Sequence, residues 1–219
     1  MAKVKVKKQE TFIDMTAMSD VTVLLLTFFM LTSTFIRPEP ITVTTPSSVS
    51  ERKIPETNLM TILVDGNGKL FMSLDNQNDM AKVIKDVGED YGYNFTPKQI
   101  ISFQQQVMFG VPIRSMAHFL DLPAEKQTEY IKDLTNPRVG IPTEEGEVRD
   151  NVGLISSDNE FKRWISHARK TNPDLQIAIK ADQSTAYPVV KTVMDNLRDL
   201  RENRYLLITN LKASEGSSH

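Results

Sequence analysis

Asp20 is the residue whose type and position most clearly indicate chemistry. It is the only charged side chain in residues 15–36, a run otherwise built of apolar and hydroxyl residues. A carboxylate inside a membrane helix costs at least about 2.5 kcal/mol on insertion scales, so such residues usually face protein or water. We interpret Asp20 as a titratable group that faces a protein partner. One alternative stays open: Asp20 lies only about a turn and a half into the span, so its carboxylate could snorkel to the membrane surface.

Hydroxyl residues share a helical face with Asp20. Thr16 lies four residues before it, Thr27 seven residues after it, and Thr34 seven residues after Thr27. Four residues are about one turn of helix and seven are nearly two, so these side chains form a polar stripe. Such a stripe belongs against protein or water rather than lipid. Because threonine stripes also serve ordinary helix packing, the stripe indicates burial of this face and not ion transport.

Asp14 is a second carboxylate, six residues before Asp20. On one helix it would lie about 9 Å lower and roughly a third of a turn round, so the two carboxylates cannot form a close pair. We therefore interpret Asp14 as a solvated residue at the membrane surface or as a helix N-cap.

Other kinds of chemistry find little support. His118, His167 and His219 are scattered without the spacing of metal ligands, and the chain has no cysteine. No metal site, disulfide or nucleophilic triad is therefore predicted. The formal net charge of −2 gives no indication of a nucleic-acid partner.

Residues 15–36 must form the element that positions Asp20. As a helix they would span about 33 Å, enough for a hydrocarbon core of about 30 Å. The alternative is a cleaved signal peptide, but the run ends before Arg37-Pro38 without a small-residue cleavage site. Four lysines within residues 1–14 precede the span, and this asymmetry predicts a basic cytoplasmic tail. Residues 38–219 would then lie outside, which is the periplasm of a bacterium with two membranes.

The outer part of the chain begins with a linker and a hairpin. Residues 37–57 are rich in Pro, Ser and Thr, and predict an extended, mobile linker. Ile41 and Val43 alternate with polar residues, and this stretch could pair as a strand if a partner offered an edge. Two alternating runs at 60–64 and 69–72 flank Asp65-Gly66-Asn67-Gly68, which predicts a β-hairpin.

The last third of the chain predicts alternating helices and strands. Apolar residues at spacings of three and four predict a helix over 158–170, capped by Ser157 or Asp158, and a second helix over 187–201. Strands are predicted over 175–181 and 204–210. Together with the hairpin they give an α+β domain over 58–212, a small open sheet with helices on one face. Such a sheet leaves an edge strand to which another chain can add.

An insertion of about 80 residues, 75–156, exceeds any plain loop. Its pattern predicts helices near 80–87, 98–109, 115–122 and 124–134, followed by a polar surface loop over 136–152. Two interpretations stay open. The insertion is either a structural cap on the domain or a docking surface for a dimer mate or an accessory protein. The second would use apolar side chains at helical spacing: Phe103, Met108, Phe109 and Met116.

The segment from 13 to 32, IDMTAMSDVTVLLLTFFMLT, resembles the ExbD/TolR family of ion-motive motor subunits. Asp20 matches the membrane aspartate of that family, and Asp14 matches the acidic residue that often precedes it. The proline that the family often has just before the aspartate is absent here. Residues 41–46, 59–73 and 177–211 are also similar to the family, although it usually has leucine where this chain has Thr45. The specific matches in the last stretch are Lys180-Ala181-Asp182 and Val193-Met194-Asp195.

The resemblance implies a subunit, not an enzyme, that is driven by the proton-motive force in the bacterial inner membrane. It implies a pentameric channel of the ExbB/TolQ kind around a dimer of this subunit, and a TonB-like or TolA-like rod that receives the force. Protons are the family's default coupling ion, Na⁺ is not excluded, and no other cofactor is expected. We predict that Asp20 carries the ion. Thr16, Thr27 and Thr34 would face the channel, and the linker residues Ile41, Val43 and Pro46 would bind a partner.

Two other functions stay open beside energised TonB-dependent transport. One is a passive single-pass anchor that presents a protein-binding module outside the membrane, with the polar stripe serving helix packing. The other is a motor subunit of the TolR or gliding type, which would share the same chemistry at Asp20.

Overall fold

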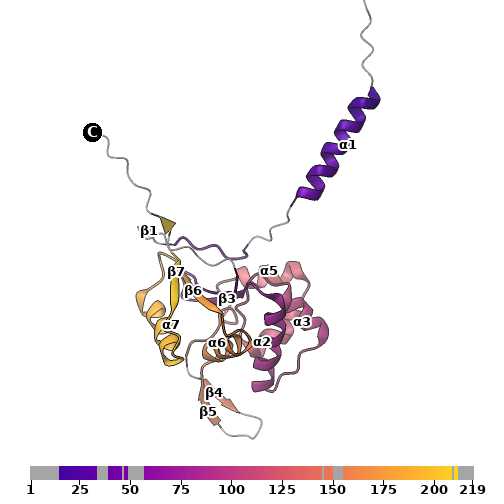
Figure 1. The fold of residues 1–219 in the computed structure, drawn as a ribbon. Coiled ribbons are helices and arrows are strands. Elements are labelled where there is room, and N and C mark those ends of the chain that lie inside the picture. Colours follow the sequence, from indigo (N-terminus) through magenta and orange to yellow (C-terminus); the bar gives the residue numbers. More distant parts are fainter. Residues whose placement is uncertain are drawn as a thin grey trace, which may run out of the picture. The chain divides into compact units, whose positions relative to one another are not determined.

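The computed structural model describes residues 15–33, 39–45, 47–48, 57–144, 146–149, 155–208 and 210–211, drawn as a ribbon in Figure 1. The chain divides into two compact units, Met1–Arg37 and Pro38–His219, and each is described by itself. The predicted basic tail, Asp14, Thr34 and Pro46 lie outside the described residues.

The described part of the first unit is dominated by one helix, α1 (Met15–Thr32). Its 18 residues contain a single charge and only a few hydroxyl groups, and none of its side chains is buried by the chain itself. It is long and apolar enough to cross a membrane. The structure therefore supports the predicted membrane span over its first 18 residues, and the rest of that span lies mostly outside the described residues.

The second unit is built on a four-stranded mixed sheet of order β3-β2-β6-β7. β2 (Leu59–Val64) and β3 (Leu70–Leu74) form the predicted antiparallel hairpin. The carboxylate of Asp65 closes its turn by accepting hydrogen bonds from the backbone N–H groups of Asn67 and Lys69 at 3.1 and 2.6 Å. β6 (Gln176–Ala181) runs parallel to β2, and β7 (Tyr205–Ile208) runs parallel to β6. The predicted α+β fold is thus confirmed.

The two helices predicted beside these strands are present as α6 (Glu160–Thr171) and α7 (Tyr187–Asp199). The predicted cap of α6 is wrong: Asn159 is the N-cap, and its side-chain oxygen accepts a hydrogen bond from the Lys162 N–H at 3.2 Å. The residues proposed as caps instead belong to β5 (Ile155–Asp158), which pairs with β4 (Gly146–Arg149). The N-cap therefore lies one residue after Asp158, the later of the two positions predicted as the cap.

The insertion is largely helical, as predicted, with α2 (Gln77–Asp90), α3 (Pro97–Gln104), α4 (Ile113–Asp121) and α5 (Ala124–Lys132). Thr96 begins α3 with a capping box, in which its side chain and that of Gln99 each bond the other residue's backbone N–H. The predicted continuation of α3 to residue 109 is wrong. The chain leaves the helix at Gln104, and Phe109 instead pairs with Met72 of β3.

The surface loop predicted over 136–152 is also wrong in part. Val139 and Ile141 are buried, with 3% and 4% of their surface exposed. The ammonium of Lys69 donates hydrogen bonds to the carbonyls of Asn136 and Val139 at 2.5 and 2.8 Å, which fixes this stretch beside the hairpin. Polar composition predicted exposure here, but the few apolar side chains in it fill the core.

The insertion and the sheet share one hydrophobic core. Phe109 packs against both Phe103 and Trp164, with ring-centroid distances of 4.8 and 4.9 Å. The carboxylate of Glu160, at the start of α6, accepts hydrogen bonds from the Trp164 indole and from the Ile113 N–H. The four apolar residues weighed for docking are all buried: Phe103, Met108, Phe109 and Met116. The structure therefore favours the structural-cap interpretation of these residues.

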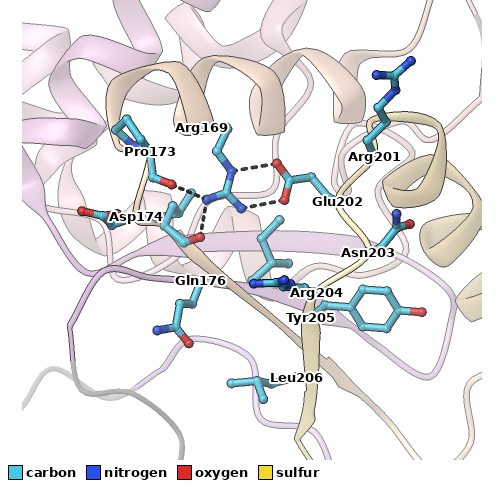
Figure 2. Close-up of a pocket in the computed structure, with 12 residues that line it drawn as sticks. Arg169, Pro173, Asp174, Gln176, Arg201, Glu202, Asn203, Arg204, Tyr205 and Leu206 are labelled. Atoms are coloured by element: carbon cyan, nitrogen blue, oxygen red, sulfur yellow. Dashed lines mark hydrogen bonds and ion pairs between the residues drawn. The ribbon is translucent and has the colours of Figure 1, made fainter.

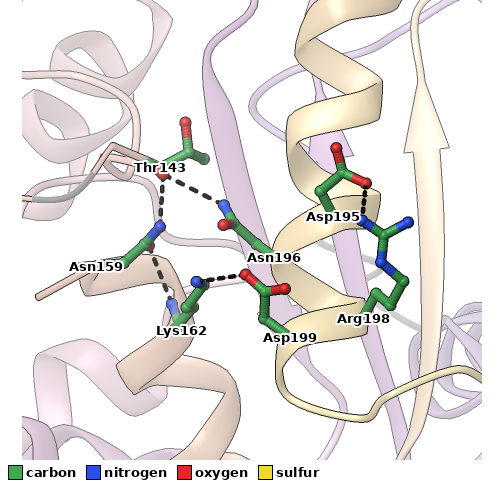
Figure 3. A network of polar contacts seen from close by, with 7 residues as sticks. All are labelled: Thr143, Asn159, Lys162, Asp195, Asn196, Arg198 and Asp199. Carbon is green, nitrogen blue, oxygen red and sulfur yellow. Dashed lines mark hydrogen bonds and ion pairs between the residues drawn. The ribbon is translucent and has the colours of Figure 1, made fainter.

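A polar network holds the end of the insertion against both helices of the core (Figure 3). The carbonyl of Thr143 accepts hydrogen bonds from the side-chain amides of Asn159 at 2.5 Å and Asn196 at 3.2 Å. Lys162 of α6 and Asp199 of α7 form an ion pair at 2.8 Å. Since buried amides need partners, these contacts fix Thr143 against both α6 and α7.

Candidate functional site

The helix α1 satisfies its hydroxyl groups internally. The hydroxyls of Ser19, Thr22, Thr27 and Thr32 each donate a hydrogen bond to a carbonyl three or four residues earlier, at 2.8–2.9 Å. Hydroxyl side chains that bond back to their own helix can sit in an apolar environment without a polar neighbour. The stripe through Thr27 therefore does not by itself require a protein partner on that face.

Asp20 is different, because its carboxylate only accepts hydrogen bonds and the N–H groups of a helix interior are already bonded to carbonyls. Its side chain is exposed on α1, and within the described residues it has no hydrogen bond or ion pair. In hydrocarbon an ionised carboxylate in this state is strongly disfavoured. The carboxylate therefore needs a proton, polar partners from another chain, or access to water at the membrane surface.

The predicted site residues fall in both units. Thr16, Asp20 and Thr27 lie on α1, all exposed. Ile41 and Val43 belong to the second unit, where Ile41 is buried and Val43 is half-buried. Thr34 and Pro46 lie outside the described residues. The role of each as a site residue stays a prediction.

Residues 39–45, part of the predicted linker, pack on the domain. The Thr44 N–H donates to the carboxylate of Asp182 at 2.8 Å, and the Thr44 carbonyl accepts from the Gln183 N–H at 2.8 Å. Lys180 and Glu39 form an ion pair at 3.0 Å. The hydroxyl and N–H of Ser184, together with the Thr44 N–H, lower the pKa of Asp182 below its usual 3.8. The linker composition gave no sign of this docking.

The same segment continues into a short strand. β1 (Ser47–Ser48) pairs in parallel with β8 (Asn210–Leu211), close to the end of the described chain. The start and the end of the domain thus meet in one backbone pairing. The strand pairing predicted for Ile41 and Val43 is not seen, because residues 41–45 form no strand in the structure; the pairing lies instead at Ser47–Ser48.

The two edges of the main sheet differ. At β3, Met72 and Phe109 exchange backbone hydrogen bonds, and the Ile141 N–H donates to the Leu70 carbonyl at 2.9 Å. β7 pairs with β6 on one side, and within the described residues no strand pairs with its other side. Leu207 of β7 has 58% of its surface exposed. Because an apolar edge strand readily accepts another chain, β7 is the edge available for the docking that the fold predicts.

No metal site is evident in the described part of the chain, which contains no group of three or more His, Cys, Asp or Glu side chains able to hold an ion. His167 is buried, and its Nε2 lies 2.7 Å from the Asp90 carboxylate, which Arg163 also contacts at 2.8 Å. This cluster joins α6 to α2, and its charged groups bind one another.

Comparison with known proteins gives one family. The family model described as Biopolymer transport protein ExbD/TolR matches residues 6–211, nearly the whole chain. No curated protein and no solved structure matches the chain significantly. The match spans α1, the docked segment 39–45 and the α+β domain together.

Proposed function

Since this chain belongs to the ExbD/TolR family of biopolymer transport proteins, we propose that it is a subunit of an ion-driven motor in which Asp20 carries the coupling ion. Members of this family are membrane-anchored transport or motor subunits that work with ExbB/TolQ-type partners, and α1 is the candidate span here. The proposal adds the role of Asp20, the ion and the direction of force transmission.

The observation that carries the proposal is the contrast between Asp20 and the hydroxyls around it. Ser19, Thr22 and Thr27 are satisfied within α1, whereas the Asp20 carboxylate has no partner in the described chain. In the proposed cycle, polar groups of an ExbB/TolQ-like channel hold the ionised form, and the protonated form passes an apolar wall. One charge crossing the membrane potential releases about 2.3 kcal/mol per 100 mV, so a few such steps could move the helix against the channel.

The remaining parts follow from the family. We propose an inner-membrane protein with a cytoplasmic N-terminus and a periplasmic domain. Two copies would sit within a pentameric channel and transmit force to a TonB-like rod. Protons are the proposed ion, with Na⁺ as the alternative. The exposed edge at β7 supports a domain that docks an extended segment of such a rod.

The main rival is a passive anchor whose hydroxyl stripe packs helices together. The satisfied hydroxyl of Thr27 weakens that rival, since its donor is already used within α1. The rival also leaves the cost of Asp20 unexplained. A motor of the TolR or gliding type shares the chemistry of Asp20 and would differ in the partner at β7.

Asp20→Asn tests the proposal, because asparagine keeps the size and polarity of the side chain but cannot take up or release a proton. The variant should be produced, insert and co-purify with the channel subunit, yet lose energised transport. Asp14→Asn is the matched control, since it removes a carboxylate of the same kind just outside the span. Wild-type transport should also stop when an uncoupler collapses the proton gradient. Energised transport that persists in Asp20→Asn would overturn the proposal.

A further inference from the structure

A polar pocket of about 810 Å³ lies where β6 and β7 begin, lined by the turns that follow α6 and α7 (Figure 2). Arg169 joins these turns. Its Nε and Nη2 donate to the two carboxylate oxygens of Glu202 at 2.7 and 2.6 Å, and its Nη1 donates to the carbonyls of Pro173 and Leu175. The guanidinium of Arg169 and the carboxylate of Glu202 thus satisfy each other and form a fixed part of the wall.

Two other arginines in the lining have side chains without a partner in the described residues. Arg201 and Arg204 are exposed, and within the described residues neither side chain has a hydrogen bond or an ion pair. Apart from Glu202, the only acidic side chain in the lining is Asp174. The lining therefore holds two arginine side chains without an ion-pair partner and only one further carboxylate, so the pocket attracts negatively charged groups that accept hydrogen bonds.

Arg201 has an unusual backbone conformation at the end of α7. α7 ends in a Schellman motif, in which the Glu202 N–H bonds the Leu197 carbonyl and the Arg201 N–H bonds the Arg198 carbonyl. Arg201 has a φ of 61°, in the left-handed region. α2 ends in the same motif with Gly92 at the equivalent position, at a φ of 73°. Arg201 thus occupies a left-handed position that favours glycine, and at the end of α2 the same position is held by Gly92.

The pocket and the exposed edge of the sheet are continuous. Tyr205 and Leu206 line the pocket and are also the first residues of β7. A segment that adds to β7 therefore passes the pocket at one of its ends. Figure 2 shows that the side chains of Arg201 and Arg204 do not point toward one another, so each would meet a separate acidic group.

We propose that this pocket binds acidic side chains of an extended polypeptide segment that adds to β7, with Arg201 and Arg204 as the specificity-determining residues. The inference rests on the proposed docking of a force-transmitting partner at this edge and adds the chemistry of that partner: a short extended stretch flanked by aspartate or glutamate. Electrostatic contacts of this kind select the partner and raise its association rate more than they add affinity.

The test uses the full-length protein in phosphatidylcholine nanodiscs and two fluorescent octapeptides. One carries two glutamates at each end of a Thr-Val repeat, and the other carries glutamines instead. The glutamate peptide should bind about five- to tenfold more tightly at low salt, a preference that fits two exposed ion pairs and that salt should weaken. On binding, the amides of residues 205–208 should gain protection from hydrogen exchange.

The double change Arg201→Gln with Arg204→Gln should remove the preference and leave the binding of the glutamine peptide unchanged. Arg138→Gln with Lys126→Gln is the matched control, because it removes the same charge from exposed positions on the insertion. Equal affinities of the two peptides for the unmodified protein would overturn the proposal. So would a preference that persists in the double variant, or protection outside β7. None of these outcomes depends on ion flow, so they are separable from the result with Asp20→Asn.

Discussion

Met72 and Phe109 form an antiparallel β-bridge, in which each residue's N–H donates to the other's carbonyl at 2.7 and 2.8 Å. This pairing places the inserted segment along the outer edge of β3. The insertion therefore completes one side of the sheet, and β7 is left as the side where another chain can add. The insertion thus covers the β3 edge of the sheet and leaves the β7 edge open within the described residues.

Gly110 should tolerate no side chain, because the backbone that follows the Phe109 bridge approaches the hairpin too closely there. A Cβ at this position would lie 2.1 Å from Cδ1 of Phe71, a ring that is fully buried. We expect Gly110→Ala to lower the free energy of unfolding by about 2–3 kcal/mol through overpacking, measured by urea denaturation.

Gly66→Ala is the control for this prediction. Its added Cβ would meet the hydroxyl of Ser184 at 2.4 Å, and that hydroxyl sits on an exposed side chain that can rotate. The loss of stability should be clearly smaller than for Gly110→Ala. Equal losses at the two positions would contradict the close fit of Gly110 against Phe71.

Local signals in the sequence predicted the elements that stand alone. The hairpin around residues 65–68 and the two helices after residue 158 follow from turn residues and apolar spacing, and the structure confirms them. Asp20 stood out because one charge in an apolar run is informative without any tertiary context.

Features that depend on distant contacts could not be predicted in this way. Phe109 continues a helical pattern in the sequence, yet its backbone pairs with Met72, 37 positions earlier. Ile41 lies in a linker composition but is buried, because the core offers it a site. The left-handed backbone of Arg201 has no sequence signal, since the expected signal at such a position is glycine.

Asp90 should make the domain more stable at neutral than at acid pH. Burial would raise the pKa of Asp90, but hydrogen bonds and charge from His167 and Arg163 outweigh it and hold the pKa below 3.8. A carboxyl with a lowered pKa stabilises the folded state above its unfolded pKa, and that contribution is lost as the pH falls through the folded pKa. Asp90→Asn should lower the free energy of unfolding by about 1 kcal/mol at pH 7 and by less near pH 3.

Urea denaturation at the two pH values checks this prediction. Asp86→Asn serves as the control, because its carboxylate is more exposed and lies 3.9 Å from Nδ1 of His167. That variant should change stability by little at either pH. A cost of Asp90→Asn that is the same at pH 3 and pH 7 would show that the charge of Asp90 contributes nothing.

The docking of residues 39–45 should depend on Asp182. Its carboxylate accepts the Thr44 N–H as well as the N–H and hydroxyl of Ser184. Asp182→Ala removes all three acceptor contacts, so hydrogen exchange at Thr44 should accelerate. Lys180→Met, which breaks only the exposed ion pair with Glu39, should have a much smaller effect. Unchanged exchange at Thr44 in Asp182→Ala would mean that the burial of Ile41 alone holds the segment.

Arg201 and Gly92 allow a reciprocal test of the strained helix end, because both occupy the left-handed position of the same motif. Arg201→Gly should raise the free energy of unfolding by about 0.5–1 kcal/mol, since glycine adopts this conformation without a Cβ clash. Gly92→Ala should lower it by a similar amount. If the arginine is kept for binding, Arg201→Gly should gain stability while weakening the preference for the glutamate peptide. Urea denaturation and peptide titration on the same preparations separate the two effects, and a stability loss in Arg201→Gly would show that its side chain supports the fold instead.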